Sequence, residues 1–322
     1  AAVLAYHSQL STCLNTFMVP WSETAQRTGG LIYTTWNQVA GDRGGTRTGR
    51  LSSTPNLQNI PTVFDDVFRG IKEAFVKTLP PLPLCRSYIC SYIGQILCGR
   101  DFSSQELRVL AHFEDGAMLE SYKNDPKVDF HQYAAEMITN TTGVVITRKV
   151  AKTIGFSILY GAGQAKVAAQ LGIAVDEAGV LLKAYYSVFP GIVRIKSELK
   201  LRARAGEPVT TIGGRQYLCE PPKIVDGRVQ TFDFKLLNYL VQGSSADQTK
   251  ESMLRFYRRV GPGYLILQVH DEIVISVPIE KKKYFMDILR ESMEYSMIDT
   301  PVLSDGEFGQ NWGAMESEPE IA

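Results

Sequence analysis

Three acidic residues fall at the ends of predicted strands, where the backbone can hold a carboxylate rigidly. Asp101 ends a strand and precedes a helix, and Asp271 and Glu272 occupy the turn of a predicted hairpin over 264–277. Carboxylate oxygens suit Mg²⁺, which takes water and substrate phosphates as its other ligands. Asp101 and Asp271 therefore predict a pair of ions, roughly 3.5–4 Å apart, for in-line phosphoryl displacement. The alternatives are a helix N-cap at Asp101 and a plain polar turn at Asp271.

A second group of candidate residues lies on one predicted helix over 148–160. Arg148, Lys152, Phe156 and Tyr160 recur every four residues, so neighbouring members of the series share a stripe on the helix surface. This stripe offers two cations to a polyphosphate and aromatic surface to a base or sugar. The alternative is a helix with a solvated charged end and a buried aromatic end.

The elements that position these residues are of mixed type. Because the carboxylates meet on one sheet and helices lie between them in sequence, we expect an α+β catalytic platform with a helical insertion. The apolar residues of 264–277 are expected to share one alternating face of their hairpin. Apolar periodicity and turn residues predict helices over 1–20 (ended by Pro20), 104–122, 129–140, 148–160, 176–188 and 234–259, strands over 31–39, 87–92 and 94–99, and a hairpin excursion over 205–233.

Composition sets broader limits on the function. A chain of 322 residues corresponds to about two domain-sized units, and 44% hydrophobic and 21% charged residues exclude wholesale disorder. Thirty-four basic and 34 acidic residues cancel, so net charge indicates no polyanionic partner. Five cysteines without a C-x-x-C pair predict reduced thiols and no zinc site. The sequence predicts no membrane span and no secretory signal, and the start at Ala1 is consistent with a fragment or a processed product.

Several segments of the chain together resemble family A DNA polymerases, the group of bacterial DNA polymerase I and many phage replicative enzymes. The resemblance runs from about residue 3 to Trp312, and RSY at 86–88 before GRDFSSQELR resembles the phage members more closely. The segments occur in the family's order: TGRLSSTPNLQNIP (48–61), DFSSQELRVLAHFEDG (101–116), DFHQYAAEMI (129–138), RKVAKTIGFSILYGAG (148–163), NYLVQGSSADQTK (238–250), LQVHDEIVI (267–275) and FGQNWG (308–313).

The resemblance implies a right-hand polymerase core with an antiparallel palm sheet and a helical fingers insertion. Residues 1–20 would be the base of the thumb or a thumb–palm helix, 21–112 and 232–322 the palm, and 113–231 the fingers. Family members carry a thumb, and usually a 3′–5′ exonuclease, before this region, so we expect the thumb to be largely missing. The chain would then be one piece of a larger or split replicative polymerase, completed by a second polypeptide or by an N-terminal part.

The resemblance also implies how the catalytic residues act. The primer 3′-hydroxyl would attack the α-phosphate of a deoxynucleoside triphosphate while two Mg²⁺ ions, replaceable by Mn²⁺, neutralise the developing charge. Asp101 and Asp271 would bind both ions, with Glu272 in an accessory role. Lys152 would contact the triphosphate and could supply a proton to the departing pyrophosphate.

By the same resemblance, further residues would contact the nucleotide and the primer-template DNA. Glu106 would be the steric gate that excludes a ribose 2′-OH, and Ser104 and Gln105 beside it depart from the Gln-Ile pair common in the family. The other nucleotide-binding residues would be Arg148, Lys152 and His131 at the triphosphate, Phe156 on the sugar and base, and Tyr160 near the template base. The DNA-binding residues would be Arg50, Asn56, Gln58, Asn59, Asn238, Gln242 and His270. The implied location is the cytoplasm of a bacterium or of an infected host cell, with no membrane partner.

Three other functions are weighed against this one. A single-subunit RNA polymerase would share the palm and the basic helix, but it should lack a gate at Glu106 and tends to carry Tyr at the position of Phe156. A metal-dependent nuclease needs the carboxylate pair but no triphosphate-binding helix. An inactive nucleic-acid-binding fragment would keep Arg50 and the basic residues 200–204 while tolerating loss of Asp101 and Asp271.

Overall fold

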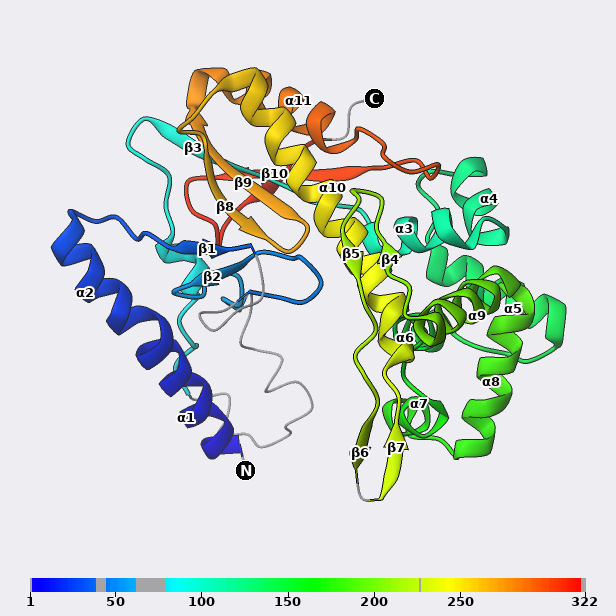
Figure 1. Cartoon of the computed structure of the whole chain (residues 1–322). Coiled ribbons are helices and arrows are strands. Elements are labelled where there is room, and N and C mark those ends of the chain that lie inside the picture. The colour runs from blue at the N-terminus through cyan, green and yellow to red at the C-terminus, as the bar shows by residue number, and fades with distance from the viewer. Residues whose placement is uncertain (1, 39–44, 62–78, 226, 320–322) are drawn as a thin grey trace.

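An antiparallel five-stranded sheet forms the centre of the molecule, with helices and short hairpins inserted between two of its strands (Figure 1). The computed structural model describes residues 2–38, 45–61, 79–225 and 227–319. The strands lie in the order β11-β10-β3-β9-β8. This mixture of helices and antiparallel strands confirms the α+β class. The strands are β3 (Gln95–Phe102), β8 (Leu265–Val269), β9 (Glu272–Pro278), β10 (Ser304–Gly309) and β11 (Glu316–Ser317).

Both faces of this sheet are covered, which corrects the expectation of one apolar face for the β8–β9 hairpin. Ile273 and Ile275 join the larger hydrophobic core, whereas Leu267 and Val269 join a smaller one. The two-residue turn pairs Val269 with Glu272, so Leu267 and Val269 oppose even-numbered residues of β9, whereas a register shift between Leu265 and Leu267 places Leu265 opposite Ile275. Directly opposed residues share a face, and the apolar side chains therefore divide between the two faces.

The larger core lies between the sheet and the helices of the insertion. Gln105 to Glu114 form α3, and the helix predicted over 104–122 is interrupted after it by Asp115, whose φ of 48° is left-handed. The helices predicted over 129–140, 148–160, 176–188 and 234–259 are confirmed, whereas the helices over 164–171, 190–205 and 282–293 were not predicted. The remaining helices are α4 (Ala117–Asn124), α5 (Phe130–Thr142), α6 (Arg148–Leu159), α7 (Gln164–Leu171), α8 (Val175–Val188), α9 (Pro190–Ala205), α10 (Leu236–Val260) and α11 (Lys282–Met293).

The N-terminal helix is longer than predicted, because it does not end at Pro20. It runs through α1 (Ala2–Thr12), the π-helical segment η1 (Cys13–Met18) and α2 (Val19–Thr28). In a regular helix the ring of Pro20 would clash with a carbonyl one turn earlier, and the wider π-helical turn lies at that point. Cys13 in η1 is buried beside Cys85, which joins this helix to the smaller core.

The remaining described elements are short. The strand predicted over 31–39 is reduced to β1 (Thr35–Asn37), which pairs with β2 (Ser52–Thr54). The strand predicted over 87–92 is wrong: Cys85–Tyr88 form the 3-10 helix η4, and Cys90 makes a single bridge to Asn311. Two hairpins occupy the predicted 205–233 excursion: β4 (Val209–Thr210) with β5 (Gln216–Tyr217), and β6 (Lys223–Val225) with β7 (Arg228–Gln230). Among the described helices, none has the length and apolar character that a membrane crossing requires.

Candidate active site

The C-terminal end of β3 carries the densest group of carboxylates near the predicted site. Asp101 lies opposite Glu272 on β9 and opposite Asp305 on β10, so three acidic side chains share one face of the sheet. Asp271 follows in the β8–β9 turn. Although Asp101 is exposed, loss of water around its carboxyl group raises its pKa to about 8, and the charges of Asp271, Glu272 and Asp305 add to the rise. The structure therefore brings Asp101 and Asp271 together.

This acidic end provides donors of the type that a divalent cation needs. The crowding of negative charge on Asp101 would be relieved by a cation, since an opposite charge favours the ionised carboxyl group. No group of three or more His, Cys, Asp or Glu side chains within the described ranges has the arrangement of a complete metal site. A partial protein donor set fits an ion such as Mg²⁺, which retains water and takes phosphate oxygens.

Glu272 shares this face, but its carboxylate is bound by Trp312. Its Oε1 accepts a hydrogen bond from the Trp312 indole nitrogen at 2.9 Å, and Arg86 stacks 3.9 Å from the centroid of the Trp312 ring. Burial raises the pKa of Glu272, while the Trp312 hydrogen bond and the charge of Arg86 oppose that rise. Sequence reasoning missed this link, although Trp312 belongs to the FGQNWG segment. Asp305 was also missed, because only the β3–β10 register reveals it.

A second cluster joins the acidic end to the helix α6. Arg50 forms an ion pair with Glu106, and Gln242 donates a hydrogen bond to the Tyr160 hydroxyl at 3.1 Å. Burial raises the pKa of Glu106, and the negative charge of Asp271 adds to the rise, whereas Arg50 and the amide of Gln242 lower it. Burial and the charges of Glu106 and Asp271 likewise raise the pKa of Tyr160. Five residues predicted for three different roles therefore form one neighbourhood.

Two glutamine side chains stabilise the turn that carries Asp271. Gln58 donates to the backbone carbonyl and to the side chain of Gln268, both at 3.1 Å, and Gln268 donates to the carbonyl of His270 at 2.6 Å. His270 has a left-handed φ of 56°, which this hydrogen bond helps to hold. Gln58 and Gln268 are buried, whereas His270 is exposed beside Asp271. Of these residues, Gln268 was not predicted.

The basic face of α6 is arranged around the start of α5. Asp129 caps α5 by accepting hydrogen bonds from two backbone amides, and its other oxygen accepts one from Arg148 Nε at 2.6 Å. His131 is buried, with its ring centroid 5.8 Å from that of Phe156. Burial, together with the charges of Lys152 and Arg148, lowers the pKa of His131 to about 4. His131 is therefore neutral at neutral pH.

A cavity of about 480 Å³ opens along this face, between α6 and α7. Of the four residues of the predicted stripe, Lys152, Phe156 and Tyr160 line it, whereas Arg148 does not and contacts Asp129 instead. Lys149 and Lys166 extend its basic rim. Lys152 is exposed, and its Nζ lies 6.0 Å from the centroid of the Phe156 ring. The cavity combines cations with aromatic surface, which suits a ligand that has both phosphates and a flat ring.

The other predicted residues occupy several environments. Gln105 is buried and donates to Ser245, Gln248 and Thr249 on α10, each at 3.2 Å, so its amide is used within the protein. The Asn56 side chain accepts from the backbone amides of Gln58 and Asn59 and stabilises that turn. The remaining three are Ser104, exposed and left-handed at the N-cap of α3; Asn59, exposed; and Asn238, whose buried Nδ2 has no hydrogen-bond partner among the described residues.

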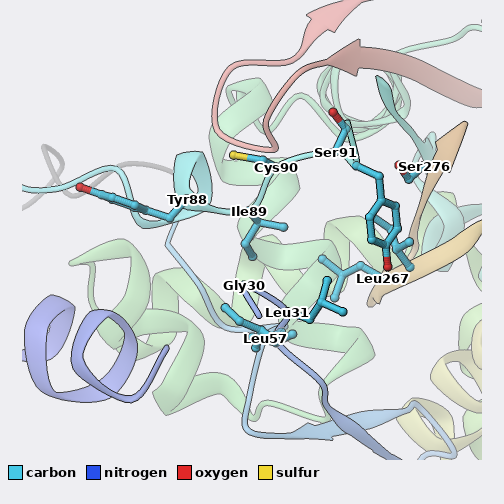
Figure 2. A pocket seen from close by; sticks show the side chains of 12 residues that line it. Gly30, Leu31, Leu57, Tyr88, Ile89, Cys90, Ser91, Leu267 and Ser276 are labelled. Carbon is cyan, nitrogen blue, oxygen red and sulfur yellow. The ribbon is translucent and has the colours of Figure 1, made fainter. Parts of the chain in front are cut away.

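A separate apolar cavity of about 260 Å³ is lined by a different set of residues (Figure 2). Leu31, Leu57, Ile89 and Leu267 gather around it, whereas Tyr88 points outward. None of the predicted catalytic, nucleotide-binding or DNA-binding residues lines this cavity. Its lining offers no charged group, so it contributes to packing around β8 rather than to phosphate chemistry.

Comparisons with known proteins agree on one family. The model of DNA polymerase family A matches residues 1–314. The thermostable DNA polymerase I of Thermus filiformis is 30% identical over 318 residues, which cover 96% of this chain and 36% of that protein. DNA polymerase I of Bacillus caldotenax is 30% identical over 321 residues, which cover 96% of this chain and 34% of that protein.

A solved structure shows the same fold. The POL domain of Pol1 from M. smegmatis, in complex with DNA primer-template and dNTP, aligns with a TM-score of 0.73 and 25% identity. The alignment covers 95% of this chain and 50% of that chain. The chain thus spans about a third of the length of the curated relatives that it matches.

Proposed function

The chain belongs to DNA polymerase family A, and on that premise we propose that it adds deoxynucleotides to the 3′-hydroxyl of a primer paired with a DNA template. The observation that supports this function most is the strand register at Asp101. It pairs Asp101 with Glu272 and so places Asp101 near Asp271, 170 positions further along the chain, beside a helix whose basic and aromatic residues line one cavity. A nuclease would use the carboxylates but would have no use for that cavity.

Family A polymerases use divalent metal ions, and we assign two Mg²⁺ ions, or Mn²⁺ in their place, to Asp101 and Asp271. When bound, the ions neutralise the charge that develops on the reacting phosphate and on the primer oxygen. Glu272 contributes indirectly, since its hydrogen bond to Trp312 braces the strand that follows Asp271. Asp305 completes the negative field that attracts the cations.

The basic face of α6 binds the incoming nucleotide in this proposal. Arg148 and Lys152 bind the triphosphate, and Phe156 packs against the sugar and base. His131 is neutral, so it serves as a hydrogen-bond donor or acceptor to phosphate rather than as a third cation. Lys152 is exposed and free of ion pairs among the described residues, so it can also deliver a proton to the departing pyrophosphate.

The residues around Glu106 suggest how the chain excludes ribonucleotides and how it contacts DNA. Arg50 holds the Glu106 side chain in place, and we propose that Glu106 fills the space of a ribose 2′-OH. Tyr160 lies near the template base, with Gln242 as its partner. Ser104 and Gln105 act by positioning α3, the second through its bonds to α10. The proposed contacts to primer-template DNA are Arg50, Asn56, Gln58, Asn59, Asn238, Gln242 and His270.

The proposed division of the chain follows the elements. Residues 21–112 and 232–322 form the palm and 113–231 the fingers, while 1–20 belong to a helix that extends to Thr28. Because the matched relatives are about three times as long, we propose that this chain works with a further part that supplies a thumb and possibly a 3′–5′ exonuclease. Bacterial relatives support the cytoplasm of a bacterium or of an infected host cell as the location.

Primer extension tests this function directly. The full chain, alone and with any co-purifying polypeptide, is given a labelled primer-template, Mg²⁺ and either dNTPs or rNTPs. We expect extension with dNTPs only; preferential use of rNTPs would favour an RNA polymerase, and shortening of the primer would favour a nuclease. Glu106→Ala should admit ribonucleotides about 30-fold better, whereas Glu106→Gln keeps the volume of the side chain and should keep most of the selectivity.

A further inference from the structure

The β6–β7 hairpin projects from the helical part of the molecule (Figure 1), and among the described elements its two strands pack mainly against each other. Its strands pair in the register Lys223↔Gln230, Ile224↔Val229 and Val225↔Arg228, and Gly227 takes a positive φ of 73° in the turn. Two-stranded hairpins are marginally stable alone in water. A hairpin of this kind that stands away from the core therefore suggests a surface that is covered by a ligand.

The two faces of this hairpin differ. Ile224 and Val229 are directly paired, share one face, and are 78% and 71% exposed. Lys223 and Arg228 lie on the opposite face and are exposed; neither makes an ion pair with any described residue. A pair of exposed β-branched side chains is too small for a stable protein interface, which buries about 800 Å² on each partner. A ligand that has both a flat apolar surface, for Ile224 and Val229, and negative charges, for Lys223 and Arg228, fits the two faces better.

The base of the hairpin is tied to the candidate active site. Glu220, just before β6, accepts hydrogen bonds from Lys235 and Tyr239 at 3.1 and 3.0 Å and forms an ion pair with Arg47. Arg47 belongs to the same loop as Arg50, the partner of Glu106. The hairpin therefore starts from a braced position beside the residues proposed to contact DNA.

The short segment that follows the hairpin, around Phe234, is packed against the end of α6. Gly161 follows Tyr160, and a Cβ atom on Gly161 would lie only 2.5 Å from the Phe234 carbonyl oxygen and 2.8 Å from its ring. Gly161 also has a φ of +67°, so only glycine fits this approach without strain. The segment after β7 therefore packs closely against Gly161. Gly161 is the neighbour of Tyr160, which is proposed to lie near the template base.

We propose that the β6–β7 hairpin contacts duplex DNA ahead of the insertion site, with Ile224 and Val229 against the first downstream base pair and Lys223 and Arg228 on backbone phosphates. This inference rests on the proposed function, since Tyr160 gives the hairpin its position relative to the template. Apolar side chains pack against and partly unstack base steps in other DNA-binding proteins, while cations supply affinity that depends on salt. The two faces of this hairpin match those two contacts.

Binding of two labelled DNAs tests the inference. One is a primed template with a single-stranded 5′ overhang; the other has a downstream strand annealed to that overhang, one nucleotide beyond the primer. Fluorescence anisotropy with the full chain should give Ile224→Ser/Val229→Ser a five- to tenfold higher Kd for the second DNA and less than a twofold change for the first. Ile279→Ser is the control, because Ile279 is 50% exposed at the far end of β9 from Asp271.

The charged face gives an independent readout. Lys223→Ala/Arg228→Ala should flatten the salt dependence of binding to the second DNA by about 1.8 in log–log slope, as two lost phosphate contacts predict. Unchanged Kd and salt slope in both double variants would overturn the inference. An equal rise in Kd for both DNAs would show instead that the hairpin contacts the single-stranded template. Failure of the unmodified chain to bind either DNA would overturn the proposed function itself, and thermal melting checks that each variant is folded.

Discussion

The acidic end of the sheet and the basic face of α6 are built by different means. Asp101 is held between two partner strands, and its position depends on the register of β3 with β9 and β10. The face of α6 is held locally by the Thr147 cap and by the contact of Arg148 with Asp129. The carboxylates are therefore fixed by long-range pairing, whereas exposed cations such as Lys152 can adjust to a ligand.

This difference predicts that the two regions tolerate substitution differently, and the largest effect is expected at the acidic end. Asp101→Asn should lower the rate of extension at least about 1000-fold, or about 4 kcal/mol, because it removes a metal-binding oxygen. The stability of the variant should equal or exceed that of the unmodified chain, since the neutral amide relieves repulsion from Asp271, Glu272 and Asp305. Primer extension and thermal melting measure the two effects.

Asp305→Asn is the matched control for that variant. Asp305 lies directly opposite Asp101 and has the same charge, but Ser103 donates a hydrogen bond to it at 2.6 Å. We expect extension to fall less than about tenfold, because this carboxylate contributes to the field and not to direct coordination. An equal loss in both variants would show that the whole acidic face, rather than the pair Asp101 and Asp271, binds the metal.

The basic face should show a smaller effect that depends on position. Lys152→Ala should lower kcat/KM for the nucleotide about 100-fold, or about 2.7 kcal/mol, since it removes a cation from the triphosphate. Lys149 is exposed on the same helix and lines the same cavity, so Lys149→Ala loses the same charge at a neighbouring position. Steady-state kinetics should show less than a fivefold loss for Lys149→Ala. Similar losses would mean that α6 attracts nucleotides only through its total charge.

The same contrast explains what could be predicted from the sequence. The stripe on α6 and most helix bounds follow from local periodicity and from caps such as Asp129, which neighbouring residues determine. The hydrogen bond of Trp312 to Glu272 and the pairing of Asp305 with Asp101 join residues that lie far apart in the sequence. No local sequence pattern contains such contacts. The Asp101–Asp271 pair was expected from the chemistry of its donors and from the family resemblance, not from the spacing of the two residues.

The electrostatics of the basic face predict a pH effect on stability. His131 has a folded-state pKa of about 4, below its ordinary value of 6.5, so the folded chain binds fewer protons than the unfolded chain between those values. The stability due to neutral His131 is fully present above pH 6.5 and is lost as the pH falls towards 4. Denaturant unfolding should show a loss of about 1 to 2 kcal/mol between pH 7 and pH 5. His131→Gln should remove most of this slope, and a slope that persists in the variant would assign it to other groups.

The smallest effect is expected at the residue that joins α5 to the basic face. Asp129→Ala removes an N-cap and should cost about 1 kcal/mol of stability, whereas Asp129→Asn retains a capping oxygen and should cost only a few tenths. Both variants release Arg148 from its carboxylate partner, so both should change KM for the nucleotide by a similar factor of about three or less. Denaturant unfolding and steady-state kinetics separate the two roles. If KM changed only in the alanine variant, Asp129 would act on Arg148 through the start of α5 rather than through charge, and the basic face would then depend on its supporting helix as strictly as the carboxylates depend on their sheet.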